Sequence, residues 1–213
     1  KRHPFLCLIV FDKLCGDFFN SINWPILQEL NVGEELRLRP HAKVSTFRIT
    51  AADGAEAESL LPAQGERRFA LGLRRFHLDH ALVERAQRVG VSVDQGVKLT
   101  RVEKDSHGWR LDMDRHGEPA TVRTKLLVGA DGRNSWVARQ LGVATVTPCG
   151  SVGFELLLQK VFALRESVEI HQFVGGYAGV VRIDENTVNI CFTVRQSLLG
   201  KAVSFESLRE RFL

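Results

Sequence analysis

An acid and a glycine stand side by side at Asp131–Gly132, after the apolar run Leu126–Val128. We expect that run to be a buried strand, and ligands bind at the carboxyl ends of strands in open α/β sheets. Gly132 allows backbone conformations that other residues avoid. Ser135 is suited to cap a helix over Trp136–Leu141, and Gly142 is suited to end it. The pattern predicts either a carboxylate that accepts hydrogen bonds from a ligand or an ordinary strand–turn–helix.

A second segment whose residues could bind a ligand is 12–17, which reads Asp-Lys-Leu-Cys-Gly-Asp. Lys13 could neutralise a phosphate or an anionic ring, and Gly16 would let the backbone approach a flat ring closely. Cys15 lies between them. The alternative is a surface turn with a small, buried cysteine.

A third segment, Arg75-Phe76-His77-Leu78-Asp79, precedes a run with helical periodicity. A guanidinium such as that of Arg75 is well built to bind phosphate or carbonyl oxygens. Arg74 competes for that role, and a solvated charge at the helix entry is the alternative. We expect Asp79 to cap the helix, which runs over Asp79–Val89, and Gly90 to end it.

The fourth segment contains Tyr177, the only tyrosine of the chain, and Gly179 two residues later. A phenol can orient a substrate or donate a proton. The alternative is an aromatic side chain packed within a sheet, since aromatic residues favour strands.

In their order along the chain, the four segments resemble the motifs of FAD-dependent monooxygenases and related class A flavoprotein oxidoreductases, closest to the geranylgeranyl-reductase-like branch. The stretch GADGRNS resembles the Asp-Gly motif, DKLCGD a loop beside the flavin, RFHLD the helix entry, and GYAG with VNIC the substrate-domain strands. The resemblance implies that Asp131, Gly132, Arg75, Lys13, Cys15 and Gly16 bind FAD, and that Tyr177 and Gly179 line the substrate pocket. It implies NAD(P)H as a donor to the flavin and a small, apolar organic substrate, and it names no catalytic residue.

The chain departs from the family pattern in three ways. Ala138 stands where many hydroxylases carry an arginine, and Arg139 follows it. The family's G-x-G-x-x-G run and its later Gly-Asp segment are missing, with their places before Lys1 and after Leu213. We therefore expect a central fragment of a longer flavoenzyme. The competing hypotheses are a non-catalytic remnant or ligand-binding module without tight FAD binding, and a β-rich ligand carrier.

The composition favours a globular protein and argues against several other classes of protein. A hydrophobic content of 44%, a charged content of 25% and a net charge of +4 are typical of a soluble globular protein. The basic residues are scattered among acids, which argues against nucleic-acid binding, and the run Phe5–Phe11 is far short of the roughly 20 residues that span a bilayer. The four cysteines lack zinc spacing, so we expect no metal site, free thiols and a cytoplasmic location.

The predicted fold class is a mixture of α/β and α+β, with a partial Rossmann-like FAD/NAD(P)-binding domain (1–30 and 75–148) interleaved with an antiparallel, β-rich substrate portion (31–74 and 149–213). Apolar alternation and turn signals define the remaining expected elements. The expected strands are 5–11, 44–50, 57–61, 68–73, 91–93, 97–103, 108–113, 120–123, 151–161, 168–173, 177–183 and 188–194, and the expected helices are 24–30 and 205–213.

Overall fold

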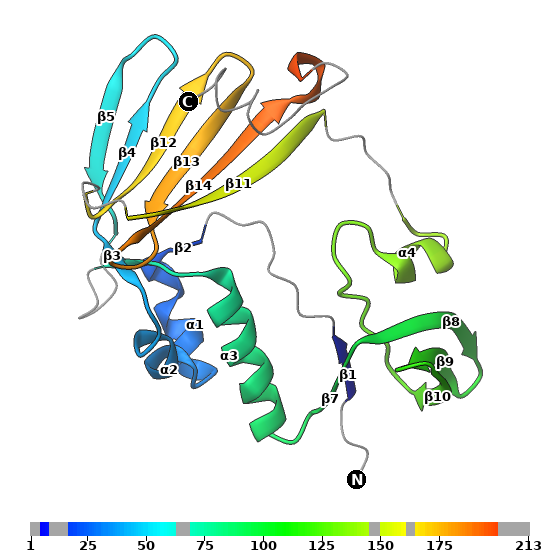
Figure 1. The fold of residues 1–213 in the computed structure, drawn as a ribbon. Coiled ribbons are helices and arrows are strands. Elements are labelled where there is room, and N and C mark those ends of the chain that lie inside the picture. Colours follow the sequence, from blue (N-terminus) through cyan, green and yellow to red (C-terminus); the bar gives the residue numbers. More distant parts are fainter. Residues whose placement is uncertain (1–4, 9–16, 63–68, 145–149, 161–164, 200–213) are drawn as a thin grey trace. The chain divides into compact units, whose positions relative to one another are not determined.

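The structure is a computed structural model that describes residues 5–8, 17–62, 69–144, 150–160 and 165–199. The chain forms two compact units. The smaller unit comprises Lys1–Val10 and Ala86–Pro148, and the larger unit comprises Phe11–Arg85 and Cys149–Leu213. The fold is mixed α/β, as the sequence predicts (Figure 1). The predicted functional division into FAD-binding and substrate portions remains a prediction.

The elements follow one another in chain order as shown in Figure 1. They are β1 (Phe5–Leu8), β2 (Phe18–Phe19), the 3-10 helix η1 (Ser21–Asn23), α1 (Trp24–Glu29), α2 (Gly33–Arg37), β3 (Ala42–Val44), β4 (Thr46–Thr50), β5 (Glu56–Leu60), β6 (Ala70–Gly72), α3 (Arg75–Arg88), β7 (Ser92–Gln95), β8 (Val97–Asp105), β9 (Gly108–Arg115), β10 (Glu118–Thr124), α4 (Trp136–Gln140), β11 (Ser151–Gln159), β12 (Ser167–Phe173), β13 (Gly176–Arg182), β14 (Thr187–Arg195) and the 3-10 helix η2 (Gln196–Leu198).

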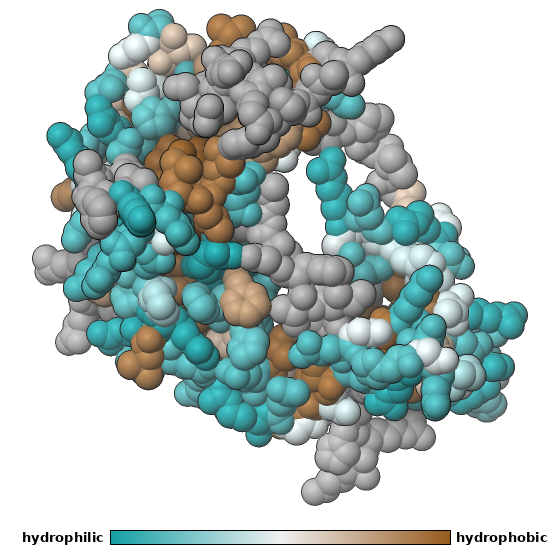
Figure 2. Space-filling view, in the orientation of Figure 1, coloured by the Kyte–Doolittle hydropathy of each residue, from teal (hydrophilic) through white to brown (hydrophobic). Residues whose placement is uncertain are grey.

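A six-stranded sheet dominates the larger unit, in the order β11-β14-β13-β12-β4-β5. All its neighbours are antiparallel except β12 and β4, which run parallel. In Figure 2 hydrophobic side chains gather over the middle strands, whereas the β5 edge is hydrophilic. The fully exposed pattern of β5 agrees with an edge strand that water covers.

One face of this sheet carries a polar network that is largely buried. Ser167, Glu169 and His171 alternate along β12 and so share a face. The Ser167 hydroxyl donates to Glu169 Oε1 at 2.8 Å, and His171 Nε2 lies 3.1 Å from Glu169 Oε2. These partners satisfy a carboxylate that is only 9% exposed, which offsets the cost of its burial.

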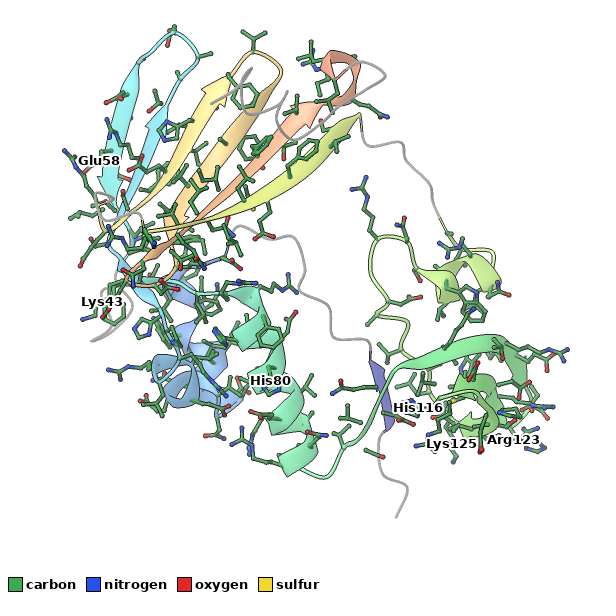
Figure 3. The ribbon with its side chains drawn as sticks, viewed as in Figure 1. Lys43, Glu58, His80, His116, Arg123 and Lys125 are labelled. Carbon is green, nitrogen blue, oxygen red and sulfur yellow. The ribbon has the colours of Figure 1, made fainter. Side chains whose placement is uncertain are left out.

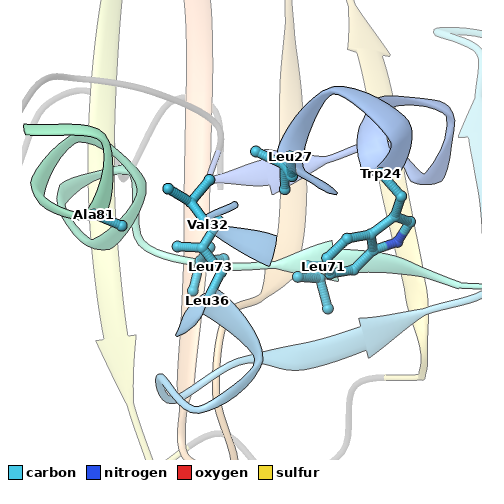
Figure 4. Close-up of a cluster of buried hydrophobic side chains, with 7 residues drawn as sticks. All are labelled: Trp24, Leu27, Val32, Leu36, Leu71, Leu73 and Ala81. Atoms are coloured by element: carbon cyan, nitrogen blue, oxygen red, sulfur yellow. The ribbon is translucent and has the colours of Figure 1, made fainter. Parts of the chain in front are cut away.

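The second sheet of the larger unit, β2-β6-β3, packs with α1, α2 and α3 around one apolar core (Figure 4). Trp24 is 1% exposed and donates its indole N–H to the Phe69 carbonyl at 3.3 Å. Its ring meets Phe19 edge-on, with centroids 6.0 Å apart. The buried members of this cluster are Trp24, Leu27, Val32, Leu36, Leu71, Leu73 and Ala81. The core therefore fixes α3, which begins at the predicted site residue Arg75, against β6.

The segment 44–50 is divided between the two sheets. We expected one strand, but β3 ends at Val44 and pairs with β6, while β4 begins at Thr46 and pairs with β12 and β5. The chain changes sheets at Ser45, whose backbone N–H donates to the Glu166 carbonyl at 2.8 Å. Alternation within a strand does not reveal which sheet each residue joins, so the sequence could not predict the division.

The smaller unit holds a parallel pair, β1 with β7, and an antiparallel sheet in the order β10-β9-β8. Val97, Leu111 and Met113 form the buried core of the three-stranded sheet. The expected strand over Leu126–Val128 is wrong: the segment is not part of any strand, and Leu126 and Val128 are 75% and 73% exposed. An apolar run becomes a strand only where a neighbouring strand pairs with it.

None of the helices in the described part of the chain is both long and apolar enough to cross a membrane.

Candidate functional site

The Asp131 corner has the caps that the sequence predicts. Ser135 accepts a hydrogen bond from the Ala138 N–H at 2.9 Å and so caps α4, and Gly142 follows the helix end. Gly132 has φ +79°, a left-handed conformation that suits glycine. The residues at this turn are exposed.

The Asp131 carboxylate is held in place by the start of α4. The Ser135 hydroxyl donates to Oδ1, and the Val137 N–H donates to Oδ2 at 3.0 Å. Partial burial alone raises the pKa of Asp131, but the hydrogen bonds from Ser135 and from the backbone N–H groups outweigh it and lower the pKa below its ordinary value of 3.8. The group is therefore ionised at neutral pH and, because it lies at an exposed turn, can accept further hydrogen bonds from a ligand.

The lowered pKa of Asp131 predicts a pH-dependent contribution to stability. Its folded pKa lies below the unfolded one, so the stabilisation is fully present above the ordinary value of 3.8 and is lost as the pH falls through the folded pKa. We expect Asp131→Asn to lower the free energy of unfolding at pH 7 and to have no effect well below pH 3.8. Urea denaturation of both proteins across this range measures the difference, and a difference that does not change with pH would contradict the assignment.

In the larger unit, the last residue of the 12–17 segment forms the centre of a polar network. Asp17 is 4% exposed and adopts φ +48°. Its Oδ1 accepts the Arg75 backbone N–H at 2.7 Å, and its Oδ2 accepts Asn189 Nδ2 at 2.8 Å. Asn189, which is fully buried, also donates to Glu155 Oε1 at 2.5 Å. We call these three side chains, Asp17, Asn189 and Glu155, the Asp17 network.

Sequence reasoning missed the role of Asp17. The prediction placed function in Lys13, Cys15 and Gly16, which lie outside the described residues, and it gave the acid that closes the motif no role. The available signal was an acid directly before the apolar pair Phe18–Phe19, because a buried charge needs partners. Which residues those partners are could not be read from the sequence.

The helix that carries Arg75 begins earlier than expected. We predicted Asp79 as its cap, but α3 begins at Arg75, and it is Asp17 that accepts the N–H of this first residue. Asp79 instead lies one turn into the helix, where its Oδ1 is 3.3 Å from Arg75 Nε. The side chain of Arg75 is 40% exposed. Gly90 ends α3 as predicted, since its N–H donates to the Gln87 carbonyl.

The histidine two residues after Arg75 does not add to its positive charge. Burial lowers the pKa of His77, and the nearby positive charges of Arg39 and Arg74 lower it further. His77 is therefore neutral at pH 7. The cationic groups at this helix entry are the arginines.

Tyr177 and Gly179 lie on the same face of the six-stranded sheet as Asn189 and Glu155 of the Asp17 network. Gly179 of β13 is opposite Cys191 of β14, which in turn is opposite Glu155 of β11. Tyr177 is 47% exposed, so its ring is not packed into the core. We call the surface formed by Tyr177, Gly179 and Asn189 the Tyr177 face. Arg75, Tyr177 and Gly179 therefore all belong to the larger unit, whereas Asp131 and Gly132 belong to the smaller unit.

The described residues contain no group of three or more histidine, cysteine, aspartate or glutamate side chains that could hold a metal ion. The polar side chains labelled in Figure 3 come from both units. Arg123 pairs with Asp105 at 2.6 Å, and His80 lies 3.4 Å from Glu84. Lys43 lies over the Phe69 ring, 5.0 Å from its centroid.

The chain is similar to a known protein family and to a curated protein. A family model described as an FAD binding domain matches residues 19–180. A curated relative, conditioned medium factor receptor 1 of Dictyostelium discoideum, is 24% identical over 192 residues, which are 84% of this chain and 38% of the relative.

Two solved structures share the fold. The myxobacterial FAD-dependent halogenase CndH superimposes with a TM-score of 0.80 at 12% identity, over 98% of this chain and 51% of its own. The flavin-dependent monooxygenase PieE, solved with FAD and substrate, gives 0.71 at 19% identity, over 98% and 42%. The chain therefore spans about half or less of the length of these proteins.

Proposed function

Because the chain belongs to the FAD binding domain family, we propose that it is part of an FAD-dependent oxidoreductase or monooxygenase that acts on a small, apolar organic molecule. Bound FAD supplies the redox chemistry, and NAD(P)H is the proposed donor of electrons to it. The protein's part is to bind the cofactor, orient the substrate and exclude water.

The observation that carries this proposal is the Asp131 carboxylate. It is exposed, ionised and held by Ser135 and the start of α4. A carboxylate in this state accepts hydrogen bonds from the hydroxyl groups of a ribityl or ribose chain, whereas it repels a bare phosphate. The residues present therefore fit the polyhydroxyl part of FAD, with Gly132 leaving room beside it.

The other roles follow from charge and position. The half-exposed guanidinium of Arg75 suits the anionic or carbonyl oxygens of the cofactor. Lys13, Cys15 and Gly16 are assigned to the cofactor from their motif alone. Tyr177 and Gly179 would contact the substrate, since the tyrosine ring is exposed beside a residue without a side chain.

FAD titration of the full-length protein tests the proposal. We expect visible flavin absorbance in the wild type and at least about tenfold weaker FAD binding in Asp131→Ala, corresponding to roughly 1.4 kcal/mol. Ser135→Ala is the matched control, because it removes the α4 cap but keeps the carboxylate. It should weaken binding less than Asp131→Ala does. Full-length protein that binds no flavin would exclude this function.

A second candidate is a ligand-binding module that keeps the fold without tight FAD binding. The observation that favours it is that the curated relative bears the name of a receptor. This candidate predicts small-molecule binding that is unaffected by Asp131→Ala. The same titration separates the two functions. For both, the proposed partner is a small molecule rather than nucleic acid, and the proposed location is the cytoplasm, because the four cysteines have no zinc-site spacing.

A further inference from the structure

The Asp17 network joins elements that are far apart in the sequence. Through Asp17 it contacts the first residue of α3, and through Asn189 it reaches β14, from which Glu155 extends it to β11. The partners of Asp17 are 58 and 172 residues away along the chain. All of these residues belong to the larger unit.

Two features of position 17, its backbone conformation and its burial, disfavour an aspartate there. A φ of +48° suits glycine better than aspartate, and burial to 4% exposure is costly for a charge. Glycine would relieve the backbone but would leave the Arg75 N–H and the Asn189 amide without this carboxylate. The contacts of the carboxylate therefore offset both costs.

The network has a defined donor and acceptor order. The one amide group of Asn189 donates to two carboxylates, Asp17 on one side and Glu155 on the other. Such an arrangement fixes the side-chain orientation of Asn189, and β14, which carries it, pairs directly with β13, which carries Tyr177 and Gly179. Asp17 thereby connects the start of the Arg75 helix to the Tyr177 face.

We propose that Asp17 is a positioning residue that sets the cofactor-binding Arg75 relative to the substrate-binding face of Tyr177 and Gly179. Asn189 and Glu155 extend its hold across β14 to β11. This inference rests on the proposed function, since it assigns Arg75 to FAD and Tyr177 to the substrate. It adds a residue that contacts neither ligand but determines how the two are placed.

The test measures FAD affinity of the full-length protein. Asp17→Asn keeps an acceptor for the Arg75 N–H but turns an amide donor toward the Asn189 amide, so we expect FAD binding at least about tenfold weaker. Asn189→Ala is a milder variant that leaves the cap on α3 and removes only the link to the sheet, and it should also weaken binding.

A triple variant tests the donor and acceptor order. Asp17→Asn with Asn189→Asp and Glu155→Gln reverses each hydrogen bond between these side chains and keeps an acceptor for Arg75. We expect it to restore FAD affinity to within about threefold of wild type, because both links are made again. An effect of Asp17→Asn that persists unchanged in the triple variant would overturn the proposal.

Ser167→Ala is the control for simple destabilisation. It removes a buried hydrogen bond to Glu169 on the other face of the same sheet. We expect its cost in thermal stability to be comparable with that of Asp17→Asn. We expect its FAD affinity to match that of wild type. If Asp17→Asn and Ser167→Ala lower FAD affinity equally, Asp17 is a structural residue only and the inference is wrong. If wild type and Asp17→Asn bind FAD with equal affinity, the inference about Asp17 is wrong but the proposed function stands. If wild type binds no FAD, the proposed function is wrong as well.

Discussion

Gly72→Ala is expected to prevent the larger unit from folding. A methyl group at this position in β6 would lie 1.7 Å from the Arg182 carbonyl oxygen and 2.8 Å from its carbon. Both are backbone atoms, so no side-chain rotation relieves the overlap. Phe18 and Ala42 pair with Gly72 from either side, which holds β6 in place. We expect the loss to exceed about 3 kcal/mol, at the upper end for single substitutions.

Expression and urea denaturation of the variant measure this loss. Gly150→Ala is the matched control, because an added Cβ at Gly150 has no heavy atom within 4 Å and the backbone there is not left-handed. It should unfold like wild type. If Gly72→Ala folds with wild-type stability, then β6 and the carbonyl of Arg182 do not approach each other this closely.

Trp24→Ala is expected to destabilise the larger unit by about 3–5 kcal/mol. The indole is 1% exposed, and its removal leaves a cavity lined by residues of α1, α2 and β6. It also removes the hydrogen bond to the Phe69 carbonyl and the edge-on contact with Phe19. Because α3 packs on the same cluster through Ala81, the Arg75 helix should loosen with it.

Two further variants separate these contributions. Trp24→Phe keeps an aromatic ring but loses the indole N–H, so we expect a smaller loss of about 1–3 kcal/mol. Ile26→Ala, at a 56% exposed position on the same helix, should change stability by less than about 1 kcal/mol. Chemical denaturation provides these values, and a loss for Ile26→Ala as large as that for Trp24→Ala would contradict the assigned core.

Features determined by near neighbours in the sequence could be predicted, and features determined by distant partners could not. The α4 caps at Ser135 and Gly142 and the end of α3 at Gly90 depend on residues a few positions away, and all three predictions are confirmed. Asp17 depends on Arg75 and Asn189, far along the chain, and its role was missed.

The same distinction explains the errors in strand prediction. The run 126–128 has the composition of a buried strand, yet no strand of the described residues pairs with it, and two of its apolar side chains are exposed. The run 44–50 has the alternation of one strand but joins two sheets. In both cases the local pattern says nothing about which strands, if any, the segment pairs with.

The parallel pairing of β4 with β12 has a consequence for how the protein is made. Ser45 bonds to Glu166, 121 residues later, and the whole of 86–148 lies between the two pieces of the larger unit. During synthesis, β4 and β5 leave the ribosome on the order of ten seconds before β12 is available. For that interval, the edge of β4 that β12 later covers has its backbone hydrogen-bonding groups unpaired. This interval, rather than the finished fold, is when the chain is most exposed to aggregation and in need of chaperones.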